Sequence, residues 1–135
     1  MKNLEKTRKY FANDRYATEL TGIIIDEVWE NYAKCSMKVR PEHLNANGFV
    51  MGGAIFTLAD FAFAAASNTE ERNSVSLSST IEYFRPAKGR ELYAEAVCKK
   101  GGRQVGFYEM TVTDEEGKKI AQVNTSGFFS AKSKE

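Results

Sequence analysis

One long apolar stretch constrains the fold of this chain more than any other feature. Residues 45–68 read NANGFVMGGAIFTLADFAFAAASN, and Asp60 is the one charged side chain among them. The stretch lacks the alternation of a strand and is rich in Ala, Leu and Phe, which predicts a helix of several turns. A helix that is apolar on nearly every side has to be covered nearly all round.

A membrane span is the rival interpretation, because residues 51–67 approach the length that crosses a bilayer. Asp60 near the middle, the dilution by Ala and Gly, and flanks without a clear charge asymmetry argue against insertion. We therefore expect a helix buried inside the protein and no membrane partner.

Strand-like runs stand on both sides of this helix. The β-branched run GIIIDEVW is followed by a turn near Asn31, and the period-2 alternation of residues 33–39 then predicts an antiparallel hairpin. The simplest cover for the helix is a curved antiparallel sheet of about six strands, which predicts an α+β fold in a single domain spanning residues 1–135. Turn signals after the helix delimit four further strands, at residues 74–84, 91–100, 103–113 and 118–130.

The two ends of the chain carry weaker signals. Short helices packed on the outside of the domain are expected in the first twenty or so residues. Leu4 and Phe11 belong to the first, Asn13 or Asp14 suits the N-cap of the second, and Gly22 suits its end. The tail AKSKE is expected to fray.

Charge and composition exclude several classes of protein. The chain has 19 Lys and Arg against 18 Asp and Glu, a balance that gives no strong field for nucleic acid or an anionic membrane. Cys35 and Cys98 are far apart in strand-like runs and His43 is the one histidine, so neither a metal site nor a disulfide is expected. The charged N-terminus, MKNLEKTRKY, lacks the apolar stretch of a secretory signal, which favours a cytoplasmic location.

The stretch LNANGFVMGGAIFTLAD resembles the entry to the central helix of the hotdog fold. It is similar to the phenylacetic-acid-degradation (PaaI-like) branch of acyl-CoA thioesterases, whose pattern is L-N-x-x-G-x-x-H-G-G followed by an Asp on the helix. The resemblance extends more weakly over most of the chain, and Met51 stands where the pattern has His. The positions that fit are Leu44, Asn45, Gly48, Gly52, Gly53 and Asp60.

Asp60 is the first candidate for chemistry. A carboxylate away from water needs partners or a proton, and its helical neighbours at i±3 and i±4 offer at most the hydroxyl of Thr57. One interpretation is a satisfied buried acid that faces a polar gap or a subunit contact. The other is catalysis, and the resemblance implies that Asp60 either activates a water or attacks the thioester carbonyl.

Gly52 and Gly53 occupy the expected start of the helix, where free backbone N–H groups and the positive end of the dipole favour a negative oxygen. A tight turn or a close backbone approach is the alternative reason for glycine there. Asp60 follows Gly52 by eight positions, which separates the two by roughly 10 to 12 Å along the axis. Because one thioester carbonyl cannot easily reach both, we expect a second copy of the chain to complete the site, as the resemblance also implies.

The resemblance implies roles for further residues near the helix. Asn45 matches a residue that holds water or the thioester carbonyl, although Asn is also common in turns. Ser76 matches a position near the reactive water, and an ordinary polar strand residue is an equal alternative. Met51 either preserves the oxyanion site and makes its wall apolar, or weakens or shifts the activity. His43 is predicted to be a surface-loop histidine.

The anionic nucleotide end of coenzyme A calls for cations around its site. The acyl chain is expected to run past apolar side chains at the interface, Phe56 and Phe63 among them, although core packing suits both. The candidate cations, each equally suited to simple solvation, are Arg85, Lys88, Arg90, Lys99, Lys100 and Arg103.

We therefore predict a homodimeric or tetrameric thioesterase that hydrolyses acyl-CoA to a free acid and CoA without a metal or redox cofactor. Aryl-acetyl, benzoyl and short- or medium-chain acyl groups all stay open. One alternative is a module that binds acyl-CoA without hydrolysing it, its activity lost with the change to Met51. A hydratase or dehydratase is a remote third, because it wants a positioned histidine.

Overall fold

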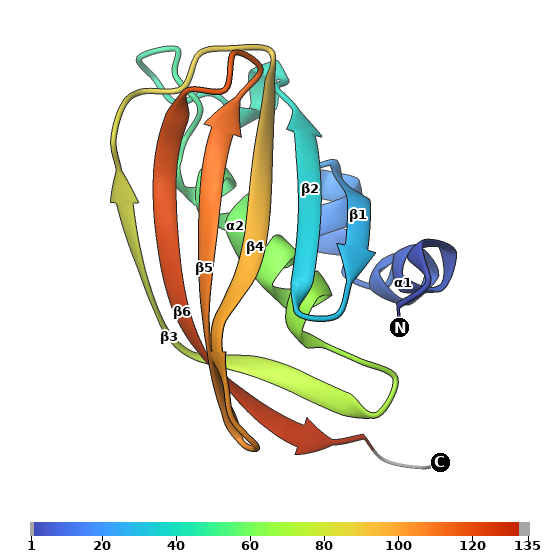
Figure 1. The fold of residues 1–135 in the computed structure, drawn as a ribbon. Coiled ribbons are helices and arrows are strands. Elements are labelled where there is room, and N and C mark those ends of the chain that lie inside the picture. The colour runs from blue at the N-terminus through green and yellow to red at the C-terminus, as the bar shows by residue number, and fades with distance from the viewer. Residues whose placement is uncertain (1, 133–135) are drawn as a thin grey trace.

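A computed structural model of the chain, which describes residues 2–132, contains a curved antiparallel sheet of six strands around one long helix (Figure 1). The strand order is β1-β2-β4-β5-β6-β3. The predicted α+β architecture is confirmed. The elements, in chain order, are α1 (Leu4–Phe11), η1 (Tyr16–Leu20), β1 (Ile23–Trp29), β2 (Tyr32–Lys38), η2 (Pro41–His43), α2 (Gly52–Ser67), β3 (Arg72–Tyr83), β4 (Glu91–Gly101), β5 (Val105–Asp114) and β6 (Lys119–Ala131).

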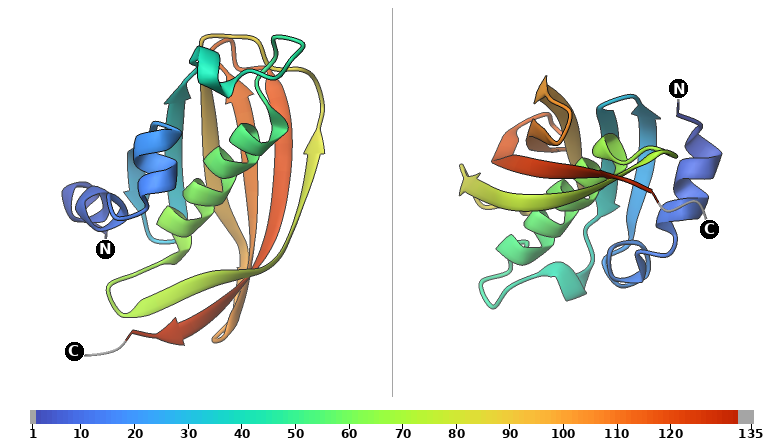
Figure 2. Two further views of the ribbon diagram at one scale, coloured as in Figure 1. Left: turned by 180° about the vertical axis from the view of Figure 1, so that it is seen from behind. Right: turned by 90° about the horizontal axis from the view of Figure 1, so that it is seen from below.

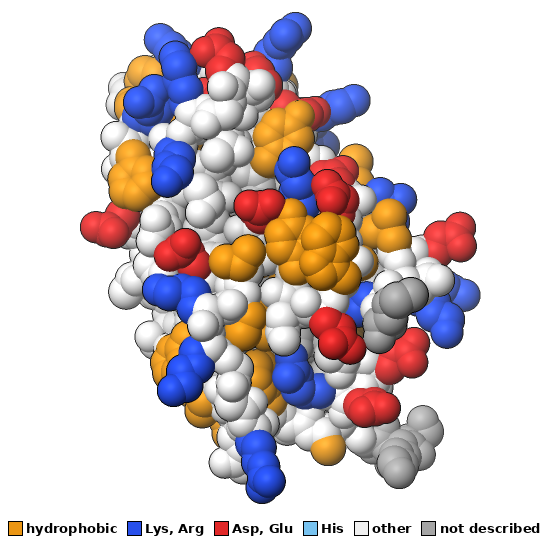
Figure 3. Space-filling model, viewed as in Figure 1, with side chains coloured by type: hydrophobic (Ala, Val, Ile, Leu, Met, Phe, Trp, Pro, Cys, Tyr) orange, Lys and Arg blue, Asp and Glu red, His pale blue; other side chains and the backbone are white. Residues whose placement is uncertain are grey.

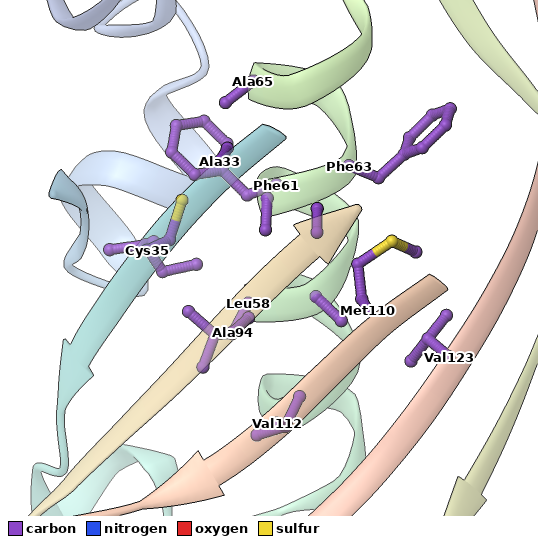
Figure 4. Packing of buried hydrophobic residues seen from close by; sticks show 14 of the residues in the cluster. Ala33, Cys35, Leu58, Phe61, Phe63, Ala65, Ala94, Met110, Val112 and Val123 are labelled. Carbon is purple, nitrogen blue, oxygen red and sulfur yellow. The ribbon is translucent and has the colours of Figure 1, made fainter. Parts of the chain in front are cut away.

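The core lies between α2 and the concave face of the sheet. Leu58, Phe61 and Phe63 of α2 are almost fully buried, and the alternate residues of the central strands, such as Ala94 and Met110, meet them (Figure 4). Small alanines on both sides let the helix approach the sheet closely, while each large apolar side chain contributes about 1.5–3 kcal/mol by leaving water. Phe63, offered above as a possible acyl contact, is a core residue.

The sheet covers α2 on one side only, whereas the sequence suggested cover nearly all round. Seen from behind, α2 lies across the concave face with its other side uncovered by strands (Figure 2). The residues left partly exposed on that side follow helical spacing, since Gly53, Thr57, Asp60 and Ala64 are three or four positions apart. Phe56, which is also partly buried, lies beside this stripe. The open stripe of α2 therefore carries its one charged side chain among small residues and one phenylalanine.

The two edges of the sheet differ. Along β1, α1 packs beside the strand, and the Nε of Arg8 donates a 2.7 Å hydrogen bond to the carbonyl of Ile25. Along β3, no described segment covers the outer edge, and Val75 and Leu77 are 58% and 60% exposed. An open edge with apolar side chains is a surface on which another strand can pair.

The predicted bounds are close to the observed ones, with small differences. Asn31 adopts a left-handed φ of 60° at the turn between β1 and β2, as the predicted turn requires. The second short helix, η1, is a single π-helical turn with no side-chain cap, so neither Asn13 nor Asp14 caps it as predicted. Of the tail, Ala131 still belongs to β6, and residues 133–135 lie outside the described part of the chain.

The structure bears on the membrane-span interpretation of the long helix and on the state of the cysteines. Within residues 2–132, no helix is long and apolar enough to span a membrane. Both cysteines are free thiols, and the side chain of Cys35, on β2, is fully buried.

Candidate functional site

The N-terminus of α2 is left open by its own sequence. Met51 is the N-cap residue and its side chain cannot accept a hydrogen bond from the first turn. Its carbonyl accepts from the N–H groups of Ala54 and Ile55, at 3.0 and 3.2 Å. The N–H groups of Gly52 and Gly53 have no partner among the described residues, so they and the helix dipole can together stabilise a negative oxygen.

The loop before the helix holds Asn45 in a tight turn. The side-chain oxygen of Asn45 accepts from the N–H groups of Asn47 and Phe49, at 2.9 and 3.1 Å, and Gly48 takes a left-handed φ of 84°. The side-chain oxygen of Asn45 is therefore used to stabilise the turn, as one of the two interpretations of this residue predicted. Its amide nitrogen has no partner among residues 2–132 and can still donate to a ligand.

Tyr83 is the residue near this site that sequence reasoning missed. It ends β3, and its hydroxyl donates a 2.9 Å hydrogen bond to the carbonyl of Gly52, the first residue of α2. A Cβ on Gly52 would lie 2.8 Å from that hydroxyl, so any other residue at this position would have to displace the Tyr83 ring. Burial raises the pKa of the Tyr83 hydroxyl above its ordinary value, so it stays a donor at neutral pH.

Asp60 lies in the middle of α2, half-buried on the open stripe. No hydrogen bond or ion pair with the rest of the described chain holds its carboxylate. Burial raises the pKa of Asp60 above its ordinary value, and the negative charge of Asp14, just before η1, raises it further. The partner that a satisfied buried acid would need is therefore absent within residues 2–132, and the carboxylate of Asp14 is close enough to act on Asp60.

The distance between Asp60 and Gly52 along α2 bears on whether one chain can form a complete active site. Asp60 follows Gly52 by eight helical residues, which places them about 12 Å apart along the axis. A nucleophile and an oxyanion donor both have to lie about 3 Å from the reacting group. Two hollows in the described part of the chain, one of about 410 Å³ beside α1 and one of about 220 Å³ against β3, β5 and β6, are lined by neither residue.

Ser76 and Met51, the remaining residues near the predicted centre, are both exposed to solvent. Ser76 is on the open edge strand β3, where the pairing with β6 shifts register between Ser76 and Ser78. No hydrogen bond within the described chain joins it to Asp60. Met51 is 54% exposed, so its side chain can form part of a wall around the open helix end.

The candidate cations fall into two groups at opposite ends of β4, the upper and lower ends in the view of Figures 1 and 3. The ends of β4 are separated by roughly 30 Å, so one chain cannot bring both groups to one phosphate. The first group is close to the helix N-terminus, because the N–H of Val50 bonds the carbonyl of Ala87 and the amine of Lys88 lies 5.9 Å from the ring centroid of Phe49. Arg85, Lys88 and Arg90 form that group, and Lys99, Lys100 and Arg103 form the other.

The prediction for His43 is wrong. This histidine is 5% exposed, its Nδ1 accepts from the N–H of Arg40, and its Nε2 lies 2.8 Å from the carbonyl of Thr21. Both ring nitrogens are therefore engaged in holding the loop before α2 against the segment that precedes β1, which leaves none for substrate. Within residues 2–132, no group of three His, Cys, Asp or Glu could hold a metal ion.

Comparison with known proteins assigns this arrangement to a family. The model of the thioesterase superfamily matches residues 47–121. The acyl-coenzyme A thioesterase PaaI of Escherichia coli is 35% identical over 112 residues, which cover 82% of this chain and 79% of that protein. The structure of E. coli PaaI superposes with a TM-score of 0.82 at 28% identity, covering 93% of this chain and 95% of the other. A Streptococcus mutans protein bound to acetyl CoA gives 0.77 at 26% identity, with 83% and 91% covered.

The chain belongs to the thioesterase superfamily, in its PaaI-like branch, and is a thioester hydrolase. The resemblance noted in the sequence is thereby confirmed for fold and for the class of reaction. The roles of Asp60, Gly52, Asn45 and Ser76 stay predictions.

Proposed function

We propose that this protein hydrolyses acyl-CoA to a free acid and CoA at a site that two copies of the chain build together. One copy supplies Asp60, and the other supplies the backbone N–H of Gly52, with that of Gly53 beside it. The observation that carries the proposal is that an unpaired carboxylate and an unpaired oxyanion donor lie about 12 Å apart on one helix. Neither has a partner among the residues of its own chain that the structure describes.

The open edge of β3 is where we place the second copy. Two copies paired there about a two-fold axis bury Val75 and Leu77, and they bring the open stripes of the two α2 helices together. The two helices then run antiparallel, so the N-terminus of each lies beside the middle of the other. The same contact thus covers both the exposed strand and the exposed stripe. Two such dimers can pair further into a tetramer.

In the proposed reaction, the thioester oxygen lies against the N–H of Gly52, which stabilises the charge that develops on it. Ionised Asp60 of the other copy takes a proton from a water that attacks the carbonyl carbon, or attacks that carbon itself to give an anhydride that water then opens. In the first route the C–S bond then breaks and Asp60 gives the proton to the departing thiolate of CoA. In the second route the C–S bond breaks as the anhydride forms, and the water that opens the anhydride supplies the proton for the thiolate. Both routes give one free acid and one CoA thiol. We assign to Asn45 and Ser76 the role of orienting the carbonyl or the water.

The substrate class follows from the family and from the surroundings of the helix. The Streptococcus mutans relative is bound to acetyl CoA, which supports CoA as the carrier. We propose that Arg85 and Lys88, close to the helix N-terminus, bind its phosphates, with Lys99 and Arg103 as the other candidates. Aryl-acetyl, benzoyl and short- or medium-chain acyl groups are the candidate acids. Neither a metal nor a redox cofactor takes part in the proposed reaction.

The test is steady-state release of CoA thiol from a panel of aromatic and aliphatic acyl-CoAs, comparing the native protein with Asp60→Asn. The native protein is expected to turn over, and the variant to lose roughly 10³-fold or more in kcat, as for other nucleophiles and bases. Circular dichroism and thermal melting check that the variant is folded. Full activity in Asp60→Asn would refute the assignment of Asp60.

The alternative raised by the sequence, a non-catalytic acyl-CoA-binding module, rests on one residue. Met51 replaces the histidine of the family pattern, and its exposed thioether can bind apolar groups but cannot position a substrate by hydrogen bonding. This function predicts tight binding of acyl-CoA by calorimetry with no thiol release from any substrate in the panel.

A further inference from the structure

We propose that Tyr83 is a positioning residue that prepares the oxyanion site through the peptide unit between Gly52 and Gly53. The inference rests on the proposed function, because it concerns how the open N-terminus of α2 stabilises the thioester oxygen. Tyr83 comes from the exposed edge strand and is not part of the sequence motif that leads into the helix.

The contact is specific in its geometry. The hydroxyl of Tyr83 donates to the carbonyl of Gly52 at 2.9 Å, while its ring occupies the space that any Cβ on Gly52 would need. The carbonyl of Gly52 and the N–H of Gly53 belong to one planar peptide unit. A donor on that carbonyl increases the double-bond character of the C–N bond and polarises the N–H at the other side of the unit.

The polarised N–H is one of the two that have no partner at the helix N-terminus among the described residues. The chain of hydrogen bonds runs from the Tyr83 hydroxyl through the Gly52–Gly53 peptide to the thioester oxygen. Each member strengthens the next as negative charge develops. The same bond also fixes the direction of the N–H, because the first turn has no side-chain cap to do so.

Neighbouring side chains of β3 place the tyrosine. The hydroxyl of Ser79 bonds that of Thr125 at 2.8 Å, and Ile81 packs against the core, so alternate residues face the helix side of the sheet. Tyr83 is the next in this series and the last residue of β3. Its ring therefore reaches the helix from a fixed strand, which gives the hydroxyl one position rather than many.

The experiment compares the native enzyme with Tyr83→Phe, which keeps the ring and removes the donor. We expect kcat for thiol release to fall about three- to tenfold, with KM within about twofold, since the bond acts on the transition state through one intervening peptide. Replacing Tyr83 by 3-fluorotyrosine, a stronger donor, should raise kcat or leave it at the native value. The control is Tyr32→Phe, whose hydroxyl bonds Glu95 at the far side of the molecule.

A second measurement does not depend on activity. The amide ¹⁵N resonance of Gly53 should move in Tyr83→Phe, because the carbonyl of its own peptide loses a donor, and should not move in Tyr32→Phe. An unchanged kcat, a change in KM alone, or an unchanged Gly53 resonance would overturn the proposal while leaving the thioesterase function intact. If the native protein releases no thiol, the proposed function fails, and the resonance alone then decides the role of Tyr83 at this peptide.

Discussion

The two ends of helix α2 are built in opposite ways. At the C-terminal end, Arg72 donates from Nε and Nη2 to the carbonyl of Ser67, and Lys2 donates to the carbonyls of Ala65 and Ala66. Asn68 adds a bond from its amide to Ala64. At the N-terminal end, two N–H groups have no partner among residues 2–132 and no side chain caps the turn.

The difference teaches how stability and function are divided along one element. Helix ends normally lose stability when their polar groups are unpaired, and caps recover about 1 kcal/mol each. Cations at the C-terminus complement the dipole and hold the helix in place. The N-terminus of α2 lacks the stability that a cap would add, and its unpaired N–H groups are available to bind an oxyanion. Stabilising contacts are therefore concentrated at one end of α2, and the proposed oxyanion site lies at the other.

The largest expected effect comes from removing a donor at the open end. Gly52→Pro deletes the N–H and fits the helix backbone, because proline suits the first helical position and Met51 already has an extended ψ of 139°. Its Cβ displaces the Tyr83 ring, as the Cβ of Gly52→Ala also does. Relative to Gly52→Ala, which adds a Cβ but keeps the N–H, we expect kcat to fall by roughly 10²–10³. Thiol-release kinetics measure this, and equal activity in the two variants would remove Gly52 as the oxyanion donor.

The next effect belongs to the closed end and concerns stability. Arg72→Met removes the charged donor from the carbonyl of Ser67 and the guanidinium that lies 3.8 Å from the ring centroid of Phe129. We expect the free energy of unfolding to fall by about 2 kcal/mol, while kcat below the melting temperature stays native. Urea denaturation measures the first. Arg15→Met, at an exposed pair with Glu19, should change stability by less than about 1 kcal/mol.

Between the two ends, the pH profile tests the environment of Asp60. The pKa of Asp60 is raised, and the proposed reaction needs its ionised form. As the pH is lowered, kcat/KM should therefore begin to fall at a higher pH than the ordinary pKa of an aspartate would give. Asp14→Asn removes the nearby negative charge, lowers the pKa of Asp60, and should move this acid limb to lower pH. Glu19→Gln, another acid on η1, is the control. A limb that moves equally in both variants would contradict the specific coupling.

The smallest effect is expected from Lys2, the other cation at the closed end. Burial, with the charge of Arg72 nearby, lowers the pKa of Lys2 to about 8, below its ordinary value of 10.5. Between these two values the unfolded chain binds a proton that the folded chain does not, so Lys2 makes stability rise with pH in that window. The difference in unfolding free energy between native and Lys2→Met should therefore grow from pH 8 to pH 9.5.

Lys6→Met is the matched control for that titration, since Lys6 is exposed on the same segment and pairs with Glu70 at 3.6 Å. Its effect on stability should not vary across the same pH range. A flat difference for Lys2→Met as well would show that the amine of Lys2 is not buried in solution.

Much of the fold could be predicted because its signals are local. The alternation of β2 and the uniform apolarity of α2 are properties of neighbouring residues, and they located both elements within a few positions. The motif around Gly52 and Asp60 likewise predicted the superfamily. The exposed stripe of α2 could not be predicted from the sequence, because it depends on which side of the helix the sheet covers.

The features that escaped prediction all depend on contacts between distant parts of the chain. Tyr83 reaches Gly52 across thirty-one positions, and Asp14 acts on Asp60 across forty-six. His43 looked like a surface residue because its loop is polar, yet it bonds Thr21, twenty-two positions away. No local pattern encodes such pairs.

The most direct measurement for the shared site mixes two inactive variants. Asp60→Asn and Gly52→Pro are unfolded together in urea at equal concentrations, refolded, and assayed for thiol release against native protein treated in the same way. If two copies complete one site, random pairing leaves one site in four intact, and the mixture should recover about a quarter of native activity. Activity no higher than that of the separate variants would show that each site is made by one chain, which would contradict the account.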